Sequence, residues 1–525
     1  MSELSQYAVP QIADLAGTKM AAWLPICLLA VSILDAAGGT GCSLRRAVPE
    51  ESLALQAGMC KRAEGGRAHS VSDLAAVASA VSASTRGAAI ASGANWRVQE
   101  DRRRELVQLE RDGRAEVGDL RVVPALRVDR LSLRGGIDAD VTAFEVKGRV
   151  DYDKLVSKWG SQRINATLIE RMEQLTGKRA HHLIRRGFFF SHRDLDKLLD
   201  DYEQGEPFYL YTGRGPSSDS LHVGHLVPFL LTQWLQEAFR VPVVIQLTDD
   251  EKFLWNQAEL DTYTQYAYAN ARDIMAVGFI PELTYVMLDT EQIAQLYPNA
   301  LRIQKLVSLA TAKSIFGFDD HSNIGQLAFP ALQIAPALSS SLPGIFPAHS
   351  DMWCLIPCAI DQDPYFRLAR DVTPRLHQRK PALLHSKFIP ALQGDVTAGK
   401  MSASSQSSAI FLTDTLEEVK AKINKFAYSG GRSSVEEHRR LGGDTSVDVS
   451  FRYLEFFLED DTALATIKSE YESGALLSGQ LKAKAISCIQ HVLARHTAAR
   501  QRVTDELLAR VLAVRPLIPA TPALS

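Results

Sequence analysis

The stretch that decides the fold is Tyr209-Leu-Tyr-Thr-Gly-Arg-Gly-Pro-Ser-Ser-Asp-Ser-Leu-His-Val-Gly-His225. The apolar run from Pro207 to Tyr211 predicts a buried strand, a loop with two glycines follows, and apolar residues at helical spacing predict a helix from Leu221 to Phe239. A strand, a glycine loop and a helix N-terminus together form an anion site, because free backbone N–H groups and the helix dipole both favour negative charge. His222 and His225 share one face of the first helical turn. We therefore expect a nucleotide triphosphate to bind here.

Composition limits the classes of protein to consider. The chain has 525 residues, too many for one hydrophobic core, so two or three domains are expected. Hydrophobic residues make up 46% and charged residues 23%, which is ordinary for a soluble globular protein. The net charge of −3 excludes a global basic field, so any RNA binding depends on a local patch. The six cysteines include no CxxC pair, which argues against a disulfide framework or a structural zinc site.

The first 140 residues differ from the rest. They are rich in Ala, Ser, Gly and Arg and show no strand–helix alternation, so we predict a poorly ordered N-terminal extension. Met20 to Leu34 is uncharged and apolar, but it is short for a membrane span and has a poor positive flank. A targeting segment remains open, but a poorly ordered extension or a mis-assigned start is favoured.

Four further apolar runs predict strands that alternate with helices. They are Val241 to Thr248, Leu283 to Leu288, Trp353 to Ile360 and Ala382 to Phe388. This alternation indicates an α/β fold with a doubly wound, parallel, Rossmann-like sheet. Such sheets bind ligands beyond the carboxyl ends of their strands. Polar clusters follow three of the predicted strands, so they should converge on one pocket; these clusters are Thr212-Gly213-Arg214, Gln246 with Glu251, and Asp361-Gln362.

Helical spacing is also present elsewhere. Asp151 to Thr176 is predicted as helix, and Ser191, three residues before Asp194, predicts the capped start of another. Glu291 to Ile315 is predicted as a helix interrupted near Pro298. The segment Gly317 to Ser350, rich in Pro, Ser and Gly, is expected to be a long loop that lines the site.

From Thr415 onward the pattern is helical only. We therefore predict an all-helical C-terminal domain after the sheet. The expected boundaries are an N-terminal extension at 1–140, a helical and hairpin lead-in at 141–204, a Rossmann-type catalytic domain with an insertion at 205–412, the helical domain at 413–515 and a tail at 516–525.

Two separated motifs carry a family resemblance. His222-Val-Gly-His225, followed far downstream by Lys400-Met-Ser-Ala-Ser404, resembles the paired signature of class I aminoacyl-tRNA synthetases. Each half alone is weak, but the two together, one opening the sheet and one closing it before a helical domain, are specific. Thr212-Gly-Arg-Gly-Pro-Ser217, Gln246-Leu-Thr-Asp-Asp-Glu-Lys252 and Ala359-Ile-Asp-Gln-Asp-Pro-Tyr-Phe366 narrow the resemblance to eukaryotic cytosolic tryptophanyl-tRNA synthetases. It extends from about residue 142 to about residue 515.

The resemblance implies a role for particular residues. The catalytic groups that grip the ATP triphosphate or close over pyrophosphate would be His222, His225 and Lys400. Further ATP contacts would come from Thr212, Gly213, Arg214, Gly224, Asp361, Met401 and Ser402. L-Tryptophan would be bound by Tyr211, Gln246, Glu251, Gln333, Gln362 and Phe366, with Tyr211 and Gln246 near the indole nitrogen. Mg²⁺ would be held through the phosphates of ATP and not by protein ligands.

The same resemblance implies partners. The helical domain would read the anticodon of tRNA(Trp), with Arg432 as a candidate contact, and the enzyme would be a cytoplasmic homodimer that does not use a membrane. Three departures from the family pattern stand out: Ala403 in place of a second lysine, Ser405-Gln-Ser-Ser408 in place of the usual Asp-Pro-Asn, and Ser433 in place of an acid. Two alternatives stay open, a tyrosine-specific sister synthetase and a non-catalytic RNA-binding paralogue.

Overall fold

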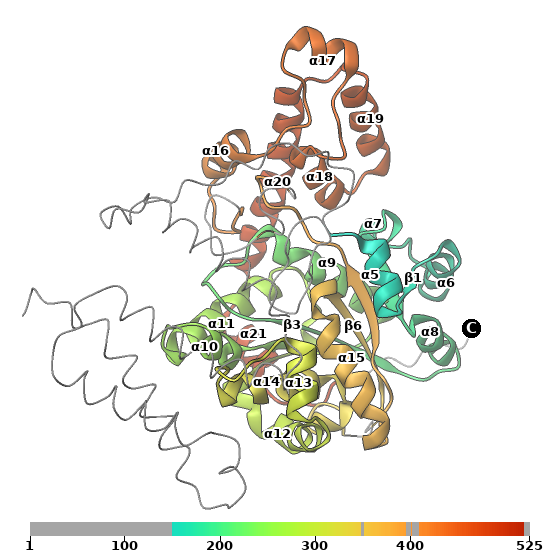
Figure 1. Cartoon of the computed structure of the whole chain (residues 1–525), viewed down its shortest axis with the longest axis vertical. Coiled ribbons are helices and arrows are strands. Elements are labelled where there is room, and N and C mark those ends of the chain that lie inside the picture. Colours follow the sequence, from blue (N-terminus) through green and yellow to red (C-terminus); the bar gives the residue numbers. More distant parts are fainter. Residues whose placement is uncertain (1–149, 348–350, 395–400, 402–408, 519–525) are drawn as a thin grey trace, which may run out of the picture. The chain divides into compact units, whose positions relative to one another are not determined.

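A mixed seven-stranded sheet forms the centre of the structure (Figure 1). The computed structural model describes residues 150–347, 351–394, 401 and 409–518, all within one compact unit, Leu131–Ser525. The strand order is β1-β2-β7-β6-β3-β4-β5. The strands are β1 (Gln162–Arg163), β2 (Phe189–Arg193), β3 (Phe208–Arg214), β4 (Val243–Leu247), β5 (Thr284–Leu288), β6 (Trp353–Ala359) and β7 (Ala382–Ser386).

Five of these strands, β3 to β7, run parallel, as the alternating pattern predicted. β3 pairs with β4 on one side and with β6 on the other. After β3, the chain therefore adds β4 and β5 on one side of this strand, and β6 then pairs with its other side. Such a reversal of strand order opens a crevice at the carboxyl edge, which is where doubly wound sheets bind ligands.

Helices cover both faces of the sheet. Phe208 and Leu210 point into one apolar layer, and Tyr209 and Tyr211 point into the other. The first layer contains α6 (Ala166–Thr176), α8 (Leu195–Glu203), α9 (Val223–Phe239), α11 (Leu260–Met275), α16 (Leu416–Phe426), α18 (Val449–Phe457), α20 (Ser478–Arg500) and α21 (Asp505–Leu512). The second contains α12 (Asp289–Leu306), α13 (Leu309–Phe316), α14 (Ile324–Ile334) and α15 (Asp363–Val372).

Two strands were not predicted from the sequence. β2 pairs antiparallel with β7, and β1 pairs antiparallel with β2. The helix start predicted at Ser191 is wrong, because Ser191 lies within β2 and hydrogen-bonds His385 of β7. The helix α8 begins after Asp194, and Nδ1 of His192 accepts the N–H of Leu195.

In three segments, helices begin or end at positions other than those predicted. The first is divided into α5 (Tyr152–Trp159), β1 and α6, because Gly160 ends α5 in the left-handed region at φ 65°. Pro298 lies inside α12 without ending it, and the break comes at Val307, after which Ser308 caps α13. The segment predicted as a long loop contains α14, which Asn323 and Gln326 begin with a reciprocal capping box.

Helices fill the region after Thr415, as predicted. Besides those given above, it contains α17 (Val435–Leu441) and α19 (Asp461–Glu472). α16, α18 and α20 share one continuous apolar cluster with the sheet, and α21 packs against β5. These four helices therefore rest on the same core as the sheet, whereas α19 packs in a separate apolar cluster with α18 and α20. Within the described ranges no helix is both long and apolar enough to cross a bilayer.

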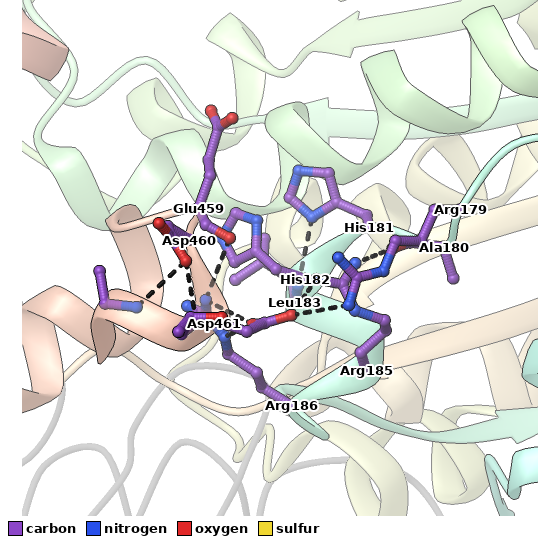
Figure 2. Close-up of polar contacts among 12 residues, drawn as sticks. Arg179, Ala180, His181, His182, Leu183, Arg185, Arg186, Glu459, Asp460 and Asp461 are labelled. Atoms are coloured by element: carbon purple, nitrogen blue, oxygen red, sulfur yellow. Dashed lines mark hydrogen bonds and ion pairs between the residues drawn. The ribbon is translucent and has the colours of Figure 1, made fainter. Parts of the chain in front are cut away.

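A polar joint links the segment before β2 to α18 and α19 (Figure 2). Asp461, at the start of α19, accepts hydrogen bonds from Arg185 and Arg186, and the Arg186 Nε distance is 2.8 Å. His182, on the short helix α7 (His182–Arg185), hydrogen-bonds the carbonyl of Phe456 through Nε2 at 2.8 Å. These contacts hold α7 to the C-terminal helices through charge and backbone groups together.

Candidate active site

A cavity of about 770 Å³ lies at the carboxyl edge of the sheet, where the order of the strands reverses. Its walls include residues that end or follow four strands: Thr212 to Gly215 at β3, Thr248, Glu251 and Lys252 after β4, Pro357 to Ala359 with Asp361 and Gln362 at β6, and Ser386 to Ile389 at β7. Of the three polar clusters predicted to converge, Thr212-Gly213-Arg214, Glu251 and Asp361-Gln362 line the cavity, and Gln246 lies behind its wall. The volume lies within the range that encloses small-molecule ligands in proteins.

One end of the cavity is the N-terminus of α9. His222 precedes the helix, and its ring stacks on that of His225 with a centroid distance of 3.4 Å. Nδ1 of His225 accepts the backbone N–H of His222 at 3.3 Å. Helix N–H groups, the positive end of the helix dipole and two imidazoles therefore face the same space, which is an arrangement suited to phosphate.

Glycine keeps this end of the cavity open. A Cβ built on Gly224 would lie 3.0 Å from the His222 ring and 3.4 Å from Sδ of Met401. A side chain at this position would crowd the His222 ring. The same distances place Met401, which belongs to the downstream motif, near the upstream motif.

The two halves of the signature are further joined through the backbone. Val223 donates to the carbonyl of Ile410 at 2.9 Å, and Leu412 donates to the carbonyl of Leu221 at 2.8 Å. The N–H of Met401 donates to the carbonyl of Ile389 at 3.2 Å. Lys400 and Ser402 lie outside the described residues, so their expected contacts with ATP remain predictions.

The other end of the cavity is lined by Gln333 of α14 and Phe366 of α15, with Tyr211 directly behind them. The Tyr211 hydroxyl donates towards Oε1 of Gln246 at 2.5 Å and towards the backbone carbonyl of Gln333 at 2.6 Å. Tyr211 and Gln246 are fully buried and lie behind the cavity wall, not on it. Burial raises the pKa of the Tyr211 hydroxyl well above its usual value, so it stays protonated.

Carboxylate and amide groups lie between the two ends. Glu251 accepts a hydrogen bond from Thr248 at 2.9 Å and pairs with Lys252 at 2.9 Å. Glu251, Asp361 and Gln362 all line the cavity. Such oxygen acceptors suit a ligand ammonium group, which has donors only.

Arginine and glycine shape the loop after β3. Burial lowers the pKa of Arg214 to about 10, although the nearby Glu251 carboxylate acts in the opposite direction. Nη2 of Arg214 lies 3.3 Å from the Ser217 hydroxyl. Thr212 and Gly213 line the cavity beside Arg214, because β3 extends to Arg214, beyond its predicted end at Tyr211.

A buried Ser–His–Asp chain braces the loop that carries Asp361 and Gln362. Ser191 lies 2.9 Å from Nδ1 of His385, and Nε2 of His385 lies 3.0 Å from Asp363. Burial alone would raise the pKa of Asp363, but the hydrogen bonds and charges of His385 and Arg193 lower it to about 2. Because these side chains are buried outside the cavity, we interpret the chain as a structural brace and not as a hydrolase triad.

Some cavity residues were not predicted, and one predicted contact lies elsewhere. Lys387, Tyr365 and Cys358 line the cavity; Lys387 directly follows β7, so the rule about strand ends could have found it. Burial raises the pKa of the Cys358 thiol well above its usual value, so it is no nucleophile. Arg432 lies among the C-terminal helices, where its Nε donates to the carbonyl of Gly442 at 2.9 Å, and its expected tRNA contact remains a prediction.

Known proteins match this chain over most of the described region. The family model for class I tRNA synthetases (W and Y) matches residues 203–494. The cytoplasmic tryptophan–tRNA ligase of Homo sapiens is 54% identical over 380 residues, which are 72% of this chain and 80% of that protein.

Solved structures agree with this match. The tryptophanyl-tRNA synthetase of Plasmodium falciparum is 45% identical with a TM-score of 0.66, covering 69% of this chain and 98% of that one. A tryptophanyl-tRNA synthetase of Encephalitozoon cuniculi bound to tryptophan is 43% identical with a TM-score of 0.65, covering 70% and 99%. The chain belongs to the class I tRNA synthetases, and among them to the tryptophanyl-tRNA synthetases of eukaryotic cytosolic type.

Proposed function

We infer that this chain is a tryptophan–tRNA ligase, which activates L-tryptophan with ATP and transfers the product to tRNA(Trp) for translation. The observation that carries the inference is one cavity with a phosphate-binding helix N-terminus at one end and amino-acid-binding groups at the other. The names of the relatives support tryptophan as the substrate, and the cytoplasmic location in the name of the human enzyme supports a cytoplasmic enzyme.

The first reaction joins the two ends of the cavity. A carboxylate oxygen of tryptophan bonds to the α-phosphorus of ATP, and the bond from that phosphorus to the bridging oxygen of pyrophosphate breaks. Tryptophanyl-adenylate and pyrophosphate result. The protein forms no covalent intermediate, so it contributes alignment and charge stabilisation.

We propose that His222, His225 and the N-terminus of α9 hold the phosphates, and that Lys400 approaches the leaving pyrophosphate. Thr212, Gly213, Gly224 and Met401 support the nucleotide around these groups. Positive and donor groups suit the negative charge that spreads over the phosphate oxygens during transfer. The position of Met401 supports this assignment, because its Sδ lies 3.4 Å from where a Cβ on Gly224 would stand, near the start of α9.

We propose that Glu251, Gln333 and Gln362 bind the tryptophan ammonium group and that Phe366 is an apolar wall for the ring. The Tyr211 and Gln246 pair would recognise the indole N–H, which phenylalanine and tyrosine lack at that position. A site built around one hydrogen bond rejects analogues that leave it unmade. In the second reaction a 2′- or 3′-hydroxyl of the tRNA end attacks the acyl carbonyl, and AMP leaves.

Mg²⁺ enters this proposal through ATP. In the part of the chain that the structure describes, no group of three or more His, Cys, Asp or Glu side chains is arranged to hold a metal. We propose that the cation is carried by the phosphate oxygens of ATP, where it would neutralise part of the triphosphate charge.

We also propose a homodimer. Apolar side chains are exposed on α10 (Asp249–Trp255) and on the adjacent α12, α13 and α14, and Ile324 is 84% exposed. The other members of this exposed set are Phe253, Tyr297, Leu301 and Leu309. Exposed apolar groups on neighbouring helices are typical of a protein–protein interface.

Charging of tRNA tests the proposed function. Purified enzyme with ATP and Mg²⁺ should attach radiolabelled tryptophan to a tRNA(Trp) transcript and leave a tRNA(Tyr) transcript uncharged. Attachment of tyrosine to tRNA(Tyr) and no tryptophan attachment would overturn the assignment.

A further inference from the structure

A buried carboxylate that belongs to none of the predicted motifs lies behind the amino-acid end of the cavity. Asp289 is the first residue of α12, directly after β5, and it is fully buried. Nε2 of Gln246 lies 2.7 Å from Oδ1 and 2.9 Å from Oδ2 of Asp289. The Gln246 amide therefore has its nitrogen towards Asp289 and its oxygen towards Tyr211.

This arrangement fixes the direction of the hydrogen bonds. The hydroxyl of Tyr211 has two acceptors within reach, Oε1 of Gln246 and the backbone carbonyl of Gln333. Its single proton is thus donated to one of these protein acceptors and not to the ligand. The side chain of Gln333, which lines the cavity, points Nε2 at the same hydroxyl oxygen from 3.5 Å. The Tyr211 oxygen therefore accepts on the side of the cavity wall, behind which it lies.

We propose that Asp289 is a positioning residue that locks the Gln246 amide, so that Tyr211 presents an acceptor oxygen to the indole N–H of tryptophan. This proposal rests on the proposed function. With the amide turned by half a rotation, its oxygen would face the Asp289 oxygens, and its nitrogen would occupy an acceptor position on Tyr211. In its observed orientation, Asp289 thus acts on specificity through Gln246 and Tyr211, without touching the substrate.

The surroundings of Asp289 are consistent with this role. Asp250 hydrogen-bonds Asp289, and burial raises the pKa of both carboxyl groups, that of Asp250 to about 6. A proton shared within this pair reduces the cost of two buried carboxyls. It also leaves Asp289 oxygen atoms available to accept both contacts from Gln246.

The test compares tryptophan with β-(benzothiophen-3-yl)alanine, in which sulfur replaces the indole N–H. The readout is the ratio of kcat/KM for the two amino acids in ATP–pyrophosphate exchange. In Asp289→Leu this ratio should fall about 10- to 100-fold, because the tryptophan value falls while the analogue changes by less than about threefold. Asp289→Asn keeps an acceptor oxygen for Gln246 and should hold the ratio within about threefold of the parent.

A double-mutant cycle separates positioning from general damage. If Asp289 acts through Tyr211, Asp289→Leu should not change the ratio further in a Tyr211→Phe background. Equal losses for both amino acids, or a persistent change of the ratio in that background, would overturn the proposal. Should Asp289→Leu not fold, Asp289→Ser serves instead, because its hydroxyl can pair with Asp250 but is too short for Gln246.

Exchange by the parent enzyme distinguishes failure of the proposed function from failure of the positioning role. No exchange with tryptophan by the parent contradicts the proposed function itself. Exchange by the parent with an unchanged ratio in the Asp289 variants contradicts only the positioning role.

Discussion

His222 lies opposite Phe411 in an isolated antiparallel bridge. Backbone hydrogen bonds on both sides of this pair join 221–223 to 410–412. The segment after the downstream motif is thus fixed to the histidine that opens α9. Because Met401 also lies near Gly224, the described residues on both sides of 402–408 lie beside the upstream motif.

Replacing Lys400 tests the downstream motif. Lys400→Ala should lower the ATP–pyrophosphate exchange rate by about 10²- to 10³-fold, because one charge facing the leaving group is lost. The dissociation constant for tryptophan, measured by equilibrium dialysis, should change by less than about threefold. Lys468→Ala, an exposed lysine on α19, is the matched control and should leave both values unchanged. An unaltered exchange rate in Lys400→Ala would show that this lysine has no catalytic part.

Removing the Tyr211 hydroxyl tests indole recognition. Tyr211→Phe should lower kcat/KM for tryptophan by about 10- to 100-fold, because the indole N–H loses its acceptor. Tyr209→Phe is a close control: Tyr209 lies on the same strand and face, is equally buried, and donates to the carbonyl of Pro336 at 2.8 Å. Both variants should lose about 1–3 kcal/mol of stability, but only the first should lose tryptophan activity. A similar kinetic loss in both would assign the effect to packing.

A side chain at Gly215 tests the Glu251 site. A Cβ at Gly215 would overlap Lys252 and lie 2.5 Å from Oε2 of Glu251, so the pair must move. Gly215→Ala should raise KM for tryptophan about tenfold while the melting temperature changes little, since flexible side-chain ends can give way. Gly479→Ala on α20, where a Cβ meets no atom within 4 Å, should leave KM unchanged. No difference in KM between the two variants would exclude Glu251 from ammonium binding.

The joint in Figure 2 should make stability depend on pH. Burial, with positive neighbours, lowers the pKa of His181 to about 3, and its Nδ1 caps α7 by accepting the N–H of Leu183. A histidine whose folded pKa is depressed takes up a proton on unfolding, so stability falls as pH decreases from 6.5 towards 3. For this group the loss between pH 7 and pH 5 is about 2 kcal/mol.

Urea unfolding of the parent and of His181→Asn at both pH values measures this loss. Asparagine retains an acceptor for the cap but does not titrate. The variant should therefore lose about 2 kcal/mol less than the parent between pH 7 and pH 5. Equal losses in the two proteins would rule out His181 as the source.

The parallel core was predictable because each of its strands is a continuous apolar run, and the chain order of strands and helices follows from local periodicity. β2 was not, because its pairing with β7 brings together Ser191 and His385, which are 194 residues apart in sequence. No local pattern reports such a partner. α14 was missed for another reason: its proline and small residues concealed the capping box of Asn323 and Gln326.

The site residues also divide into those that short motifs predict and those that only the fold identifies. His222, His225 and the residues at strand ends belong to short motifs, and the cavity brings them together. The buried position of Gln246 and its contact with Asp289 follow from the register of three neighbouring strands, in which Gln246 lies beside Gly213 on one side and Met287 on the other. Asp289 follows β5 outside any recognised motif, so only the folded sheet identifies it.

The most direct test of the whole account is ATP–pyrophosphate exchange by the purified chain, with tryptophan and tyrosine compared at the same concentrations. A tryptophan-specific synthetase should exchange with tryptophan and favour it over tyrosine by at least about 10⁴-fold in kcat/KM. Exchange with tyrosine alone, or with neither amino acid, would contradict the assignment.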